Sequence, residues 1–407
     1  MKHGGLAIVA AAVFLTGVGW AGTPMTAAGK PAEGELEPFL GAPRFDIQEV
    51  FGTPRFPNVV ASAAGTVLAT WGRYDFVVRR SEDGGRTWGP EIVVHEHGRH
   101  GGGATVDERS GKTFVFVPGA ERERRQDPFV YRSADDGKTW EQVDVVFHRD
   151  ENGNLPIFHM NERGLTLRHG AHPGRLIFPV TSSPGKGGYR YTKAMYSDDG
   201  GETWHSSAPF PAEGTLEGSL AELSDGRIYY SSRRNRGPKP GEEGVLVRPE
   251  EISEEDIGPE HIMRHTAWSY DAGETWNDLS TSDLLYDGGG MRVGHGIMAG
   301  LVRLPVKNRD ILLFSQPGTE GVGRHSMTVW ASFDGGRTWP VKRLVYGGPS
   351  AYSSLAAGRP GTPSEGWVFL LFEGGENHRY EGGLMARFNL SWLLEGEPTG
   401  DGEIPPL

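Results

Sequence analysis

The sequence has 407 residues and a formal net charge of −12, which, without any long basic run, excludes nucleic acid as the expected partner. An acidic chain can bind an anion only through a local cluster of positive groups. The chain has no cysteine, which excludes disulfides and lipid-modified cysteines, and its 61 glycines and 28 prolines are typical of many short strands joined by tight turns.

The N-terminus resembles a secretory leader. Lys2 and His3 precede an apolar stretch over residues 6–20, and small residues follow at Ala21 and Gly22. We expect a signal peptide over residues 1–21, a secreted or periplasmic protein, and no stable membrane insertion after cleavage. A single membrane anchor is the alternative, for which the stretch is short. Residues 22–45, rich in Pro, Gly, Ala and Thr, predict a flexible linker.

One eight-residue pattern, Ser-x-Asp-x-Gly-x-Thr-Trp, dominates the rest of the chain. In each copy the Ser and Asp side chains can bond the amides of their own turn, and the glycine can adopt a conformation closed to other residues. Apolar β-branched runs precede most copies, so each predicts a hairpin turn between two strands. The five copies are SEDGGRTW (Ser81–Trp88), SADDGKTW (Ser133–Trp140), SDDGGETW (Ser197–Trp204), SYDAGETW (Ser269–Trp276) and SFDGGRTW (Ser332–Trp339).

The spacing of the copies predicts the fold. Successive copies start 52, 64, 72 and 63 residues apart, which is about one four-stranded blade with loop insertions for each interval. Five marked blades and one unmarked blade closed by the chain ends make an all-β, six-bladed β-propeller. We expect it to cover residues 46–396, with residues 397–407 as a tail.

Several polar residues lie outside these turns at strand ends. Arg55 precedes an apolar strand in PRFPNVVASAAGTVLAT, where burial is costly unless the charge is paired. In LEGSLAELSDGRIYYSSRRN, Glu217 and Arg233 flank a strand, a turn and a second strand. Strand alternation places the neighbouring Arg234 on the opposite face. A surface arginine at a strand end is the alternative interpretation of Arg55.

Three further polar residues at strand ends are candidate site residues. Arg324 lies one short strand before the last repeat, after the turn residues Ser315 and Pro317. Tyr352 lies in SAYSSLAAG, and Glu373 ends the strand of WVFLLFEGG.

These motifs, in this order and spacing, resemble those of the sialidase family over about residues 46–395. The eight-residue repeats match its Asp boxes, and the PRFP segment resembles its FRIP motif, with Phe56 in place of the usual Ile. The resemblance implies the sialidase propeller fold. Asp boxes also occur in propellers that are not sialidases, so the repeats bear on the fold and not on the function.

The resemblance also implies site roles. Arg55, Arg233 and Arg324 would clamp the carboxylate of a sialic acid through bidentate, charge-assisted bonds. Glu373 would orient Arg55. Tyr352 would be the nucleophile, activated by Glu217: a neutral phenol is not repelled by the substrate carboxylate, but it needs a base to take its proton.

The general acid is the weakest match. In TWGRYDFVVRRSEDGG only Tyr74 and Asp75 separate Arg73 from the next strand, and Asp75 is the sole carboxylate of this short loop. Asp75 is either the catalytic acid on a shortened loop or a structural aspartate at the strand start. Arg73 matches an accessory arginine that contacts the sugar.

Two other segments depart from the family pattern. His95, His97 and His100 follow the first repeat and could supply a replacement acid, line the sugar pocket, bind a metal or lie in a solvated loop. Residues 161–163 (Asn-Glu-Arg) face the site in the family, so the substrate could differ from the common acetylated sialic acid, and Glu162 is a fallback acid.

We therefore expect an exo-α-sialidase that hydrolyses terminal sialic acids with retention, needs no cofactor and binds sialylated or other acidic glycans. The alternatives are a hydrolase of a related 2-keto sugar acid and a non-catalytic acidic-sugar-binding propeller. A lyase or trans-sialidase could use the same residues.

Overall fold

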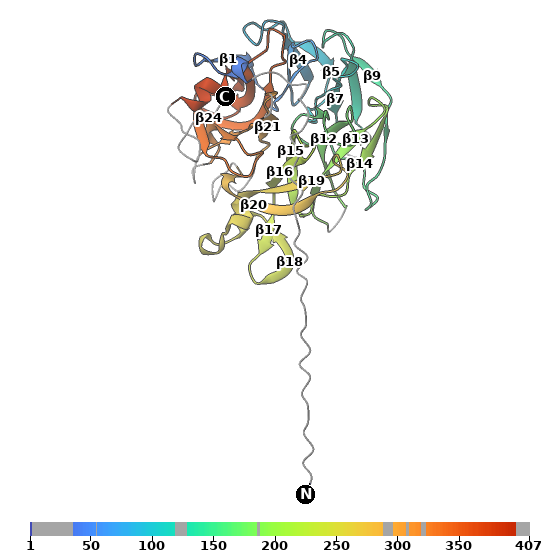
Figure 1. Ribbon diagram of the computed structural model, residues 1–407, viewed down its shortest axis with the longest axis vertical. Helices are drawn as coiled ribbons and strands as arrows, with labels where there is room; N and C mark the ends of the chain where they lie inside the picture. Colours follow the sequence, from blue (N-terminus) through green and yellow to red (C-terminus); the bar gives the residue numbers. More distant parts are fainter. Residues whose placement is uncertain are drawn as a thin grey trace.

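The computed structural model describes residue 1 and residues 36–395, apart from residues 54, 119–127, 185–187, 288–295, 307–308 and 319–322. These residues form an all-β, propeller-like arrangement with short helices at its margins (Figure 1). No helix among them is long and apolar enough to span a bilayer. Residues 2–21 of the expected signal peptide, residues 22–35 of the expected linker and the expected C-terminal tail lie outside the described residues.

Four sheets stand as separate blades, and each is built from consecutive segments of the chain. The first holds β2 (Asn58–Ala61), β3 (Val67–Trp71), β4 (Phe76–Ser81) and β5 (Ile92–His95). The second holds β6 (Thr105–Val106), β7 (Thr113–Val117), β8 (Phe129–Ser133) and β9 (Glu141–Val143). The third holds β10 (Val146–Phe147), β11 (Leu165–Thr166), β12 (Leu176–Ser182), β13 (Tyr191–Ser197) and β14 (Thr203–Ser206), and the fourth β15 (Thr215–Glu222), β16 (Ile228–Arg234), β19 (Met263–Ser269) and β20 (Asn277–Tyr286).

The remaining large sheet has seven strands in the order β1-β26-β25-β24-β23-β22-β21. The expectation of six separate blades differs from this arrangement because the 17-residue strand β24 pairs with β23 through its first part and with β25 through its second. The strands are β1 (Phe45–Phe51), β21 (Gly300–Arg303), β22 (Leu312–Pro317), β23 (His325–Ser332), β24 (Val341–Ala357), β25 (Val368–Gly374) and β26 (Gly382–Phe388).

The five repeats are the tight turns that the sequence predicts. In every copy the glycine amide donates to the serine Oγ at 2.8 or 2.9 Å. The threonine amide donates to the aspartate Oδ1 at 2.9 Å. The glycine has a φ between 80° and 94° in all five copies, a region that side chains rarely adopt. Each turn begins at the last residue of a strand: β4, β8, β13, β19 and β23.

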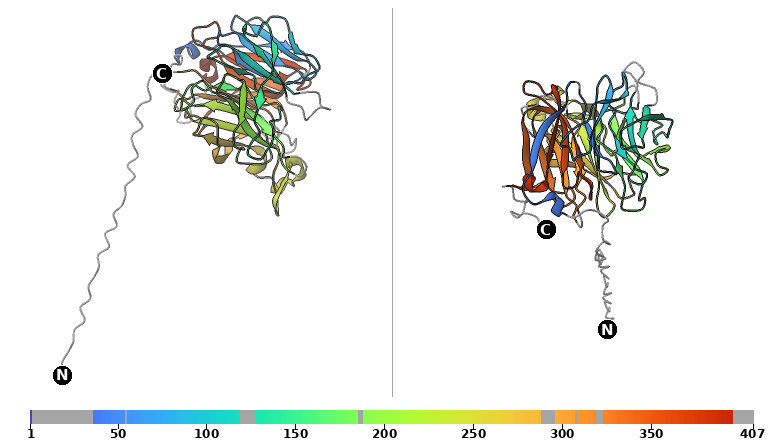
Figure 2. Two further views of the ribbon diagram at one scale, coloured as in Figure 1. Left: turned by 90° about the vertical axis from the view of Figure 1, so that its right-hand side faces the viewer. Right: turned by 90° about the horizontal axis from the view of Figure 1, so that it is seen from above.

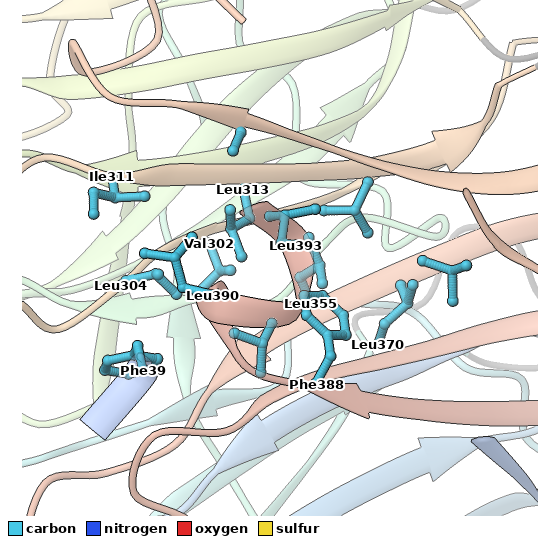
Figure 3. Packing of buried hydrophobic residues seen from close by; sticks show 14 of the residues in the cluster. Phe39, Val302, Leu304, Ile311, Leu313, Leu355, Leu370, Phe388, Leu390 and Leu393 are labelled. Carbon is cyan, nitrogen blue, oxygen red and sulfur yellow. The ribbon is translucent and has the colours of Figure 1, made fainter. Parts of the chain in front are cut away.

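The chain ends close the molecule. Strand β1 runs antiparallel to β26, with Phe45 opposite Phe388, so the first strand belongs to the last sheet (Figure 2). The preceding 3-10 helix η1 (Glu37–Phe39) and the C-terminal helix α2 (Leu390–Leu394) cover one end of the largest core cluster (Figure 3). Phe39 is buried there, so the described end of the expected linker packs on the domain.

A small hairpin of β17 (Gly237–Lys239) and β18 (Glu242–Val247) projects from the fourth sheet (Figure 1). It is followed by η3 (Pro249–Glu251), η4 (Glu254–Asp256) and α1 (Pro259–Ile262). Near the centre, the inner strands of several sheets are tied together: the amide of Val59 in β2 donates to Ser354 Oγ in β24, and the amide of Gly218 in β15 donates to Asn161 Oδ1 before β11. The candidate site lies at the ends of these strands.

Candidate active site

Arg55, which is partly exposed, forms a two-point ion pair with the buried Glu373. Arg55 Nε lies 2.9 Å from Glu373 Oε1, and Nη2 lies 3.2 Å from Oε2. The same carboxylate accepts the amides of Phe56 at 3.1 Å and Tyr352 at 3.2 Å. Glu373 therefore links three segments that are far apart in the sequence, and it fixes the plane of the Arg55 guanidinium.

Tyr352, Glu217 and Arg233 meet in the interior. Tyr352 Oη donates to Glu217 Oε1 at 2.6 Å, and Arg233 Nη1 lies 2.6 Å from Glu217 Oε2. Arg233 Nη1 also lies 3.3 Å from Tyr352 Oη. The neighbouring Arg234 turns away as alternation predicts, and its Nη2 contacts His265 and Thr281.

Irregular backbone places the tyrosine and the glutamate. Glu217 has a φ of 48°, and the pairing of β15 with β16 shifts register between Leu216 and Gly218. The pairing of β24 with β25 shifts between Ser350 and Ser353, on either side of Tyr352. Such bulges re-aim a side chain from the face that strand alternation would give it. A positive φ at a non-glycine residue is also a strain that tends to occur at functional sites.

The electrostatics set the resting protonation states of Tyr352 and Glu217. Burial, reinforced by the charge of Glu217, raises the pKa of Tyr352, so the phenol is neutral at neutral pH. Burial alone would raise the pKa of Glu217, but the charge of Arg233 and the hydrogen bonds from Tyr352 and Arg233 bring it below its ordinary value. The pair is therefore a neutral phenol against an ionised carboxylate, as a base-activated nucleophile requires.

Arg324 faces the same tyrosine. Its guanidinium lies 5.3 Å from the centre of the Tyr352 ring, and that of Arg55 lies 5.1 Å from it. Arg324 Nη1 donates to Tyr380 Oη at 2.9 Å, and Nη2 donates to the carbonyl oxygen of Gly296 at 3.0 Å. The guanidinium of Arg55 also stacks on Tyr380, with its central carbon 3.9 Å from the centre of the Tyr380 ring. The three predicted arginines thus surround one tyrosine.

These groups line a cavity of about 790 Å³. Arg55, Arg233, Arg324 and Tyr352 reach its surface, whereas Glu217 and Glu373 lie buried behind them. The other lining residues are His159, Ser183, Gly188, Tyr189, Arg190, Gly214, Leu216, Asn235, Arg236, Arg248 and Tyr380. No residue of the five repeats is among them, which agrees with a purely structural role for the repeats.

Asp75 and Arg73 neither line this cavity nor lie buried behind its lining, in contrast to the other predicted site residues. Both are exposed, on the loop between β3 and β4. Asp75 accepts the amide of His97 at 2.7 Å. The loop adjoins the site through its backbone, since the amide of Gly72 donates to the carbonyl oxygen of Arg55 at 3.1 Å.

The three histidines that follow the first repeat have different surroundings, and none lines the cavity. His100 is buried between Thr70 Oγ1 and the amide of Gly102, and burial lowers its pKa to about 3. His95 Nδ1 contacts Tyr131 Oη at 2.7 Å, and His97 is exposed. Within the described ranges, no group of three or more metal-binding side chains is placed to hold an ion.

The segment at residues 161–163 lies deeper than the cavity. Glu162 is fully buried, accepts Ser354 Oγ at 2.8 Å and the amide of Leu355 at 3.1 Å, and does not reach the cavity. Burial raises the pKa of Glu162 to about 8, against the charge of Arg163. The site residue here is His159, whose Nε2 lies 3.7 Å from Glu217 Oε1.

His159 and Tyr380 carried no signal of their own in the sequence, because neither belongs to a repeat or to a recognised motif. Burial lowers the pKa of His159 to about 4, reinforced by the charges of Arg99, Arg190 and Arg233 and opposed by that of Glu217. The imidazole is therefore neutral at neutral pH and can hydrogen-bond without adding charge.

Comparison with known proteins finds similarity to a repeat family and to sialidases. The family described as BNR repeat-like domain matches residues 68–242, which include the first three repeats. The sialidase of Micromonospora viridifaciens is 29% identical over 405 residues, and the match covers 92% of this chain. This chain is similar to sialidases over most of its length. The sialidase of Bacteroides fragilis (strain YCH46) is 25% identical over 353 residues, covering 74% of this chain.

The chain spans 56% and 57% of the lengths of these two curated relatives. Among solved structures, the Hadza microbial sialidase Hz136 superposes with a TM-score of 0.64 at 24% identity, covering 83% of this chain and 66% of that one. The intramolecular trans-sialidase from Ruminococcus gnavus, in complex with oseltamivir carboxylate, gives a TM-score of 0.61 at 16% identity, covering 88% and 96%. These likenesses show the fold.

Proposed function

We propose that this protein is a retaining exo-α-sialidase that releases terminal sialic acids from glycans. One observation carries the proposal: the buried Tyr352–Glu217 hydrogen bond of 2.6 Å lies below a cavity that three arginines enter. Sialidases are the glycosidases that use a tyrosine in place of a carboxylate nucleophile. A non-catalytic anion-binding propeller would need the arginines but not a phenol bonded to an ionised base.

The proposed reaction begins with the substrate carboxylate held by Arg55, Arg233 and Arg324. Tyr352 Oη attacks the anomeric carbon while its proton passes to Glu217, and the bond to the leaving oxygen breaks. A general acid protonates that oxygen. The same residue, now a carboxylate, takes a proton from a water molecule, which attacks the anomeric carbon of the glycosyl-tyrosine. The phenolate leaves and recovers its proton from Glu217, and the two inversions give net retention.

Asp75 is the proposed general acid, with Arg73 as an accessory sugar contact. The support is positional: Asp75 is the sole carboxylate of the loop that adjoins Arg55 through the Gly72–Arg55 hydrogen bond. Its hydrogen bond to the His97 amide fixes one carboxylate oxygen and leaves the side chain exposed. Catalytic hydrogen bonds often tighten only in the substrate complex, so its place outside the cavity lining does not exclude the role.

We also propose that the propeller has six blades, with the seven-stranded sheet counted as two. The first part of β24 completes a blade with β21, β22 and β23, and the second part forms a blade with β25, β26 and β1. The bulge between Ser350 and Ser353 supports this division, because it interrupts the ladder where the two blades would separate.

The test is release of a fluorescent aglycone from the α-glycosides of acetylated and deaminated sialic acid, with the anomer of the first product followed by NMR. We expect wild type to turn over at least one substrate with retention. We expect Asp75→Asn to lose far more activity on a sialyl-lactose, whose leaving group needs protonation, than on the aryl glycoside. Release with inversion, or no release at high enzyme concentration, would refute the proposed function. Equal effects on the two leaving groups would remove Asp75 from the acid role.

A further inference from the structure

Tyr380 is an aromatic residue of the cavity that the proposed reaction does not use. It lines the cavity with Arg55 and Arg324, and it lies in the turn between β25 and β26. Glu373 lies near the end of β25, so one hairpin supplies two side chains that contact Arg55. Glu373 pairs with Nε and Nη2 at one edge of the guanidinium, and Tyr380 covers its face. Arg55 is therefore oriented both in its plane and from one side by the same hairpin.

Tyr380 contacts two of the three proposed clamp arginines in different ways. The ring of Tyr380 is the closest aromatic ring to the Arg55 guanidinium, with a separation of 3.9 Å. The corresponding separations are 4.7 Å for Phe56 and 5.1 Å for Tyr352. Arg324 Nη1 donates to Tyr380 Oη at 2.9 Å. The electron-rich ring face attracts one cation and the oxygen lone pair attracts the other, so one side chain holds two like charges beside the same part of the cavity.

The turn that carries Tyr380 is held by contacts of its own. Both carboxylate oxygens of Glu381 accept the amide of Asn377, each at 3.2 Å. From the neighbouring strand β24, Tyr346 Oη donates to the carbonyl oxygen of Gly375 at 2.9 Å. The hydroxyl of Tyr380 is therefore positioned before any ligand binds.

The hydroxyl of Tyr380 can donate a hydrogen bond to a ligand. A phenol has one hydrogen to donate and lone pairs to accept, and the contact with Arg324 uses only a lone pair. Within the part of the chain that the structure describes, no acceptor lies in hydrogen-bond distance of this hydrogen. The bond from Arg324 also polarises the hydroxyl and makes it a stronger donor. An anion held at the arginines would therefore meet a further donor at Tyr380.

We propose that Tyr380 binds the substrate carboxylate as a fourth donor, beside Arg55, Arg233 and Arg324. The inference rests on the proposed function, which places this carboxylate among the three arginines. A phenol can hold two cations in place without the negative charge of a carboxylate, which would repel the substrate anion. The hydrogen bond from the hydroxyl to a carboxylate oxygen is charge-assisted, and no bond is made or broken at Tyr380.

The test measures binding and does not require turnover. The ligands are the unsaturated glycals of acetylated and deaminated sialic acid, which keep the carboxylate but have no glycosidic bond to cleave. They are titrated calorimetrically into wild type, Tyr380→Phe and Tyr346→Phe, and the tighter complex of wild type is crystallised. Tyr380→Phe removes the hydroxyl and keeps the ring that covers Arg55. Tyr346→Phe is the matched control, because it removes a hydroxyl that holds the same turn from outside the cavity lining.

We expect Tyr380 Oη to lie roughly 2.7 Å from a carboxylate oxygen of the bound glycal. The affinity should fall about tenfold or more in Tyr380→Phe and stay within about twofold of wild type in Tyr346→Phe, because a hydrogen bond to a charged group is lost only in the former. A separation beyond about 3.5 Å, an unchanged affinity in Tyr380→Phe, or equal losses in the two variants would overturn the inference.

The proposed function and the role of Tyr380 fail in different ways. If wild type releases sialic acid but Tyr380 does not contact the glycal, only the role of Tyr380 is refuted. If the contact and the loss in Tyr380→Phe are found but wild type releases no sialic acid, the carboxylate-binding role stands and the hydrolase proposal fails. Failure of both glycals to bind wild type refutes the role of Tyr380, whatever the activity.

Discussion

The proposed roles of Tyr352 and Glu217 depend on their neighbours in the folded protein, which the identity of the two residues alone does not reveal. The hydroxyl of Tyr352 is 2.6 Å from Glu217, and both lie at strand bulges that turn their side chains toward each other. Sequence spacing identified both residues through family resemblance. It could not predict the bulges, which depend on pairing with β16 and β25, or the neighbour His159, which enters the site from a segment without a motif.

Arg55 and Glu373 show which part of the site is predictable. They are 318 residues apart and form a two-point ion pair, as the resemblance implies. The role of Asp75 is less predictable. Its loop is too short to match the sialidase sequence pattern, and Asp75 lies outside the cavity lining. The contact between Arg236 and Tyr189 was also not predictable from the sequence, because it requires the β17–β18 hairpin to support both side chains.

Glu162 gives a prediction about pH and stability. Burial raises its pKa from the ordinary 4.5 to about 8, so the folded state holds this proton more tightly than the unfolded state does. The stability gained from the proton is complete below about pH 4.5 and is lost as the pH rises through about 8. Glu162→Gln keeps an oxygen that can accept the bonds of Ser354 Oγ and the Leu355 amide, and it does not titrate.

The measurement is thermal unfolding of wild type and Glu162→Gln at pH 5, 7 and 9. We expect wild type to lose stability relative to the variant as the pH rises. The difference should change by a few kcal/mol in total, because each tenfold change in proton affinity corresponds to about 1.4 kcal/mol. Parallel pH curves for the two proteins would show that Glu162 does not titrate in this way.

At the scale of elements, the repeated turns are the part of the fold that sequence predicts best. Their hydrogen bonds are local, so eight residues contain all the groups that make them. The strands between them are less predictable, because their edges depend on partners elsewhere. The length of β24 is an example: nothing in its sequence shows that it joins β23 and β25 into one sheet.

Asp199 of the third repeat tests the turn. Its Oδ1 accepts Ser197 Oγ at 2.7 Å and the amides of Glu202 at 3.1 Å and Thr203 at 2.9 Å. Asp199→Ala should lower the free energy of unfolding by about 1–3 kcal/mol, because these turn donors lose their acceptor. The control, Glu151→Ala, removes a carboxylate from an exposed turn and should change stability by less than about 0.5 kcal/mol. Equal effects in urea unfolding would contradict the structural role of the repeat.

At the scale of the whole molecule, the chain ends complete the ring. Strand β1 pairs with β26, and Phe51 at its end stacks on Trp71 of the first blade with ring centres 5.3 Å apart. The sequence predicted closure by the chain ends, because five marked units leave one blade unmarked. It placed the start of the packed chain too late, since Phe39 already belongs to the core.

Phe51 and Phe45 provide a matched pair for testing the closure. Phe51 is 2% exposed and bridges the last sheet to the first, whereas Phe45 on the same strand is 37% exposed and stacks on Trp392. Phe51→Ala should cost about 3–5 kcal/mol, the usual range for a buried phenylalanine. Phe45→Ala should cost clearly less, and similar losses in the free energy of unfolding would argue against closure through β1.

The central claim is that Tyr352 is the nucleophile, and covalent trapping tests it most directly. A sialosyl fluoride with a second fluorine beside the anomeric carbon slows breakdown of the glycosyl-enzyme, so the adduct can be located by mass spectrometry. We predict one added sugar on wild type, with fragment ions that place it on Tyr352 and not on Tyr346, and no adduct on Tyr352→Phe. An adduct on another residue, or hydrolysis of a sialoside by Tyr352→Phe at the wild-type rate, would contradict the account.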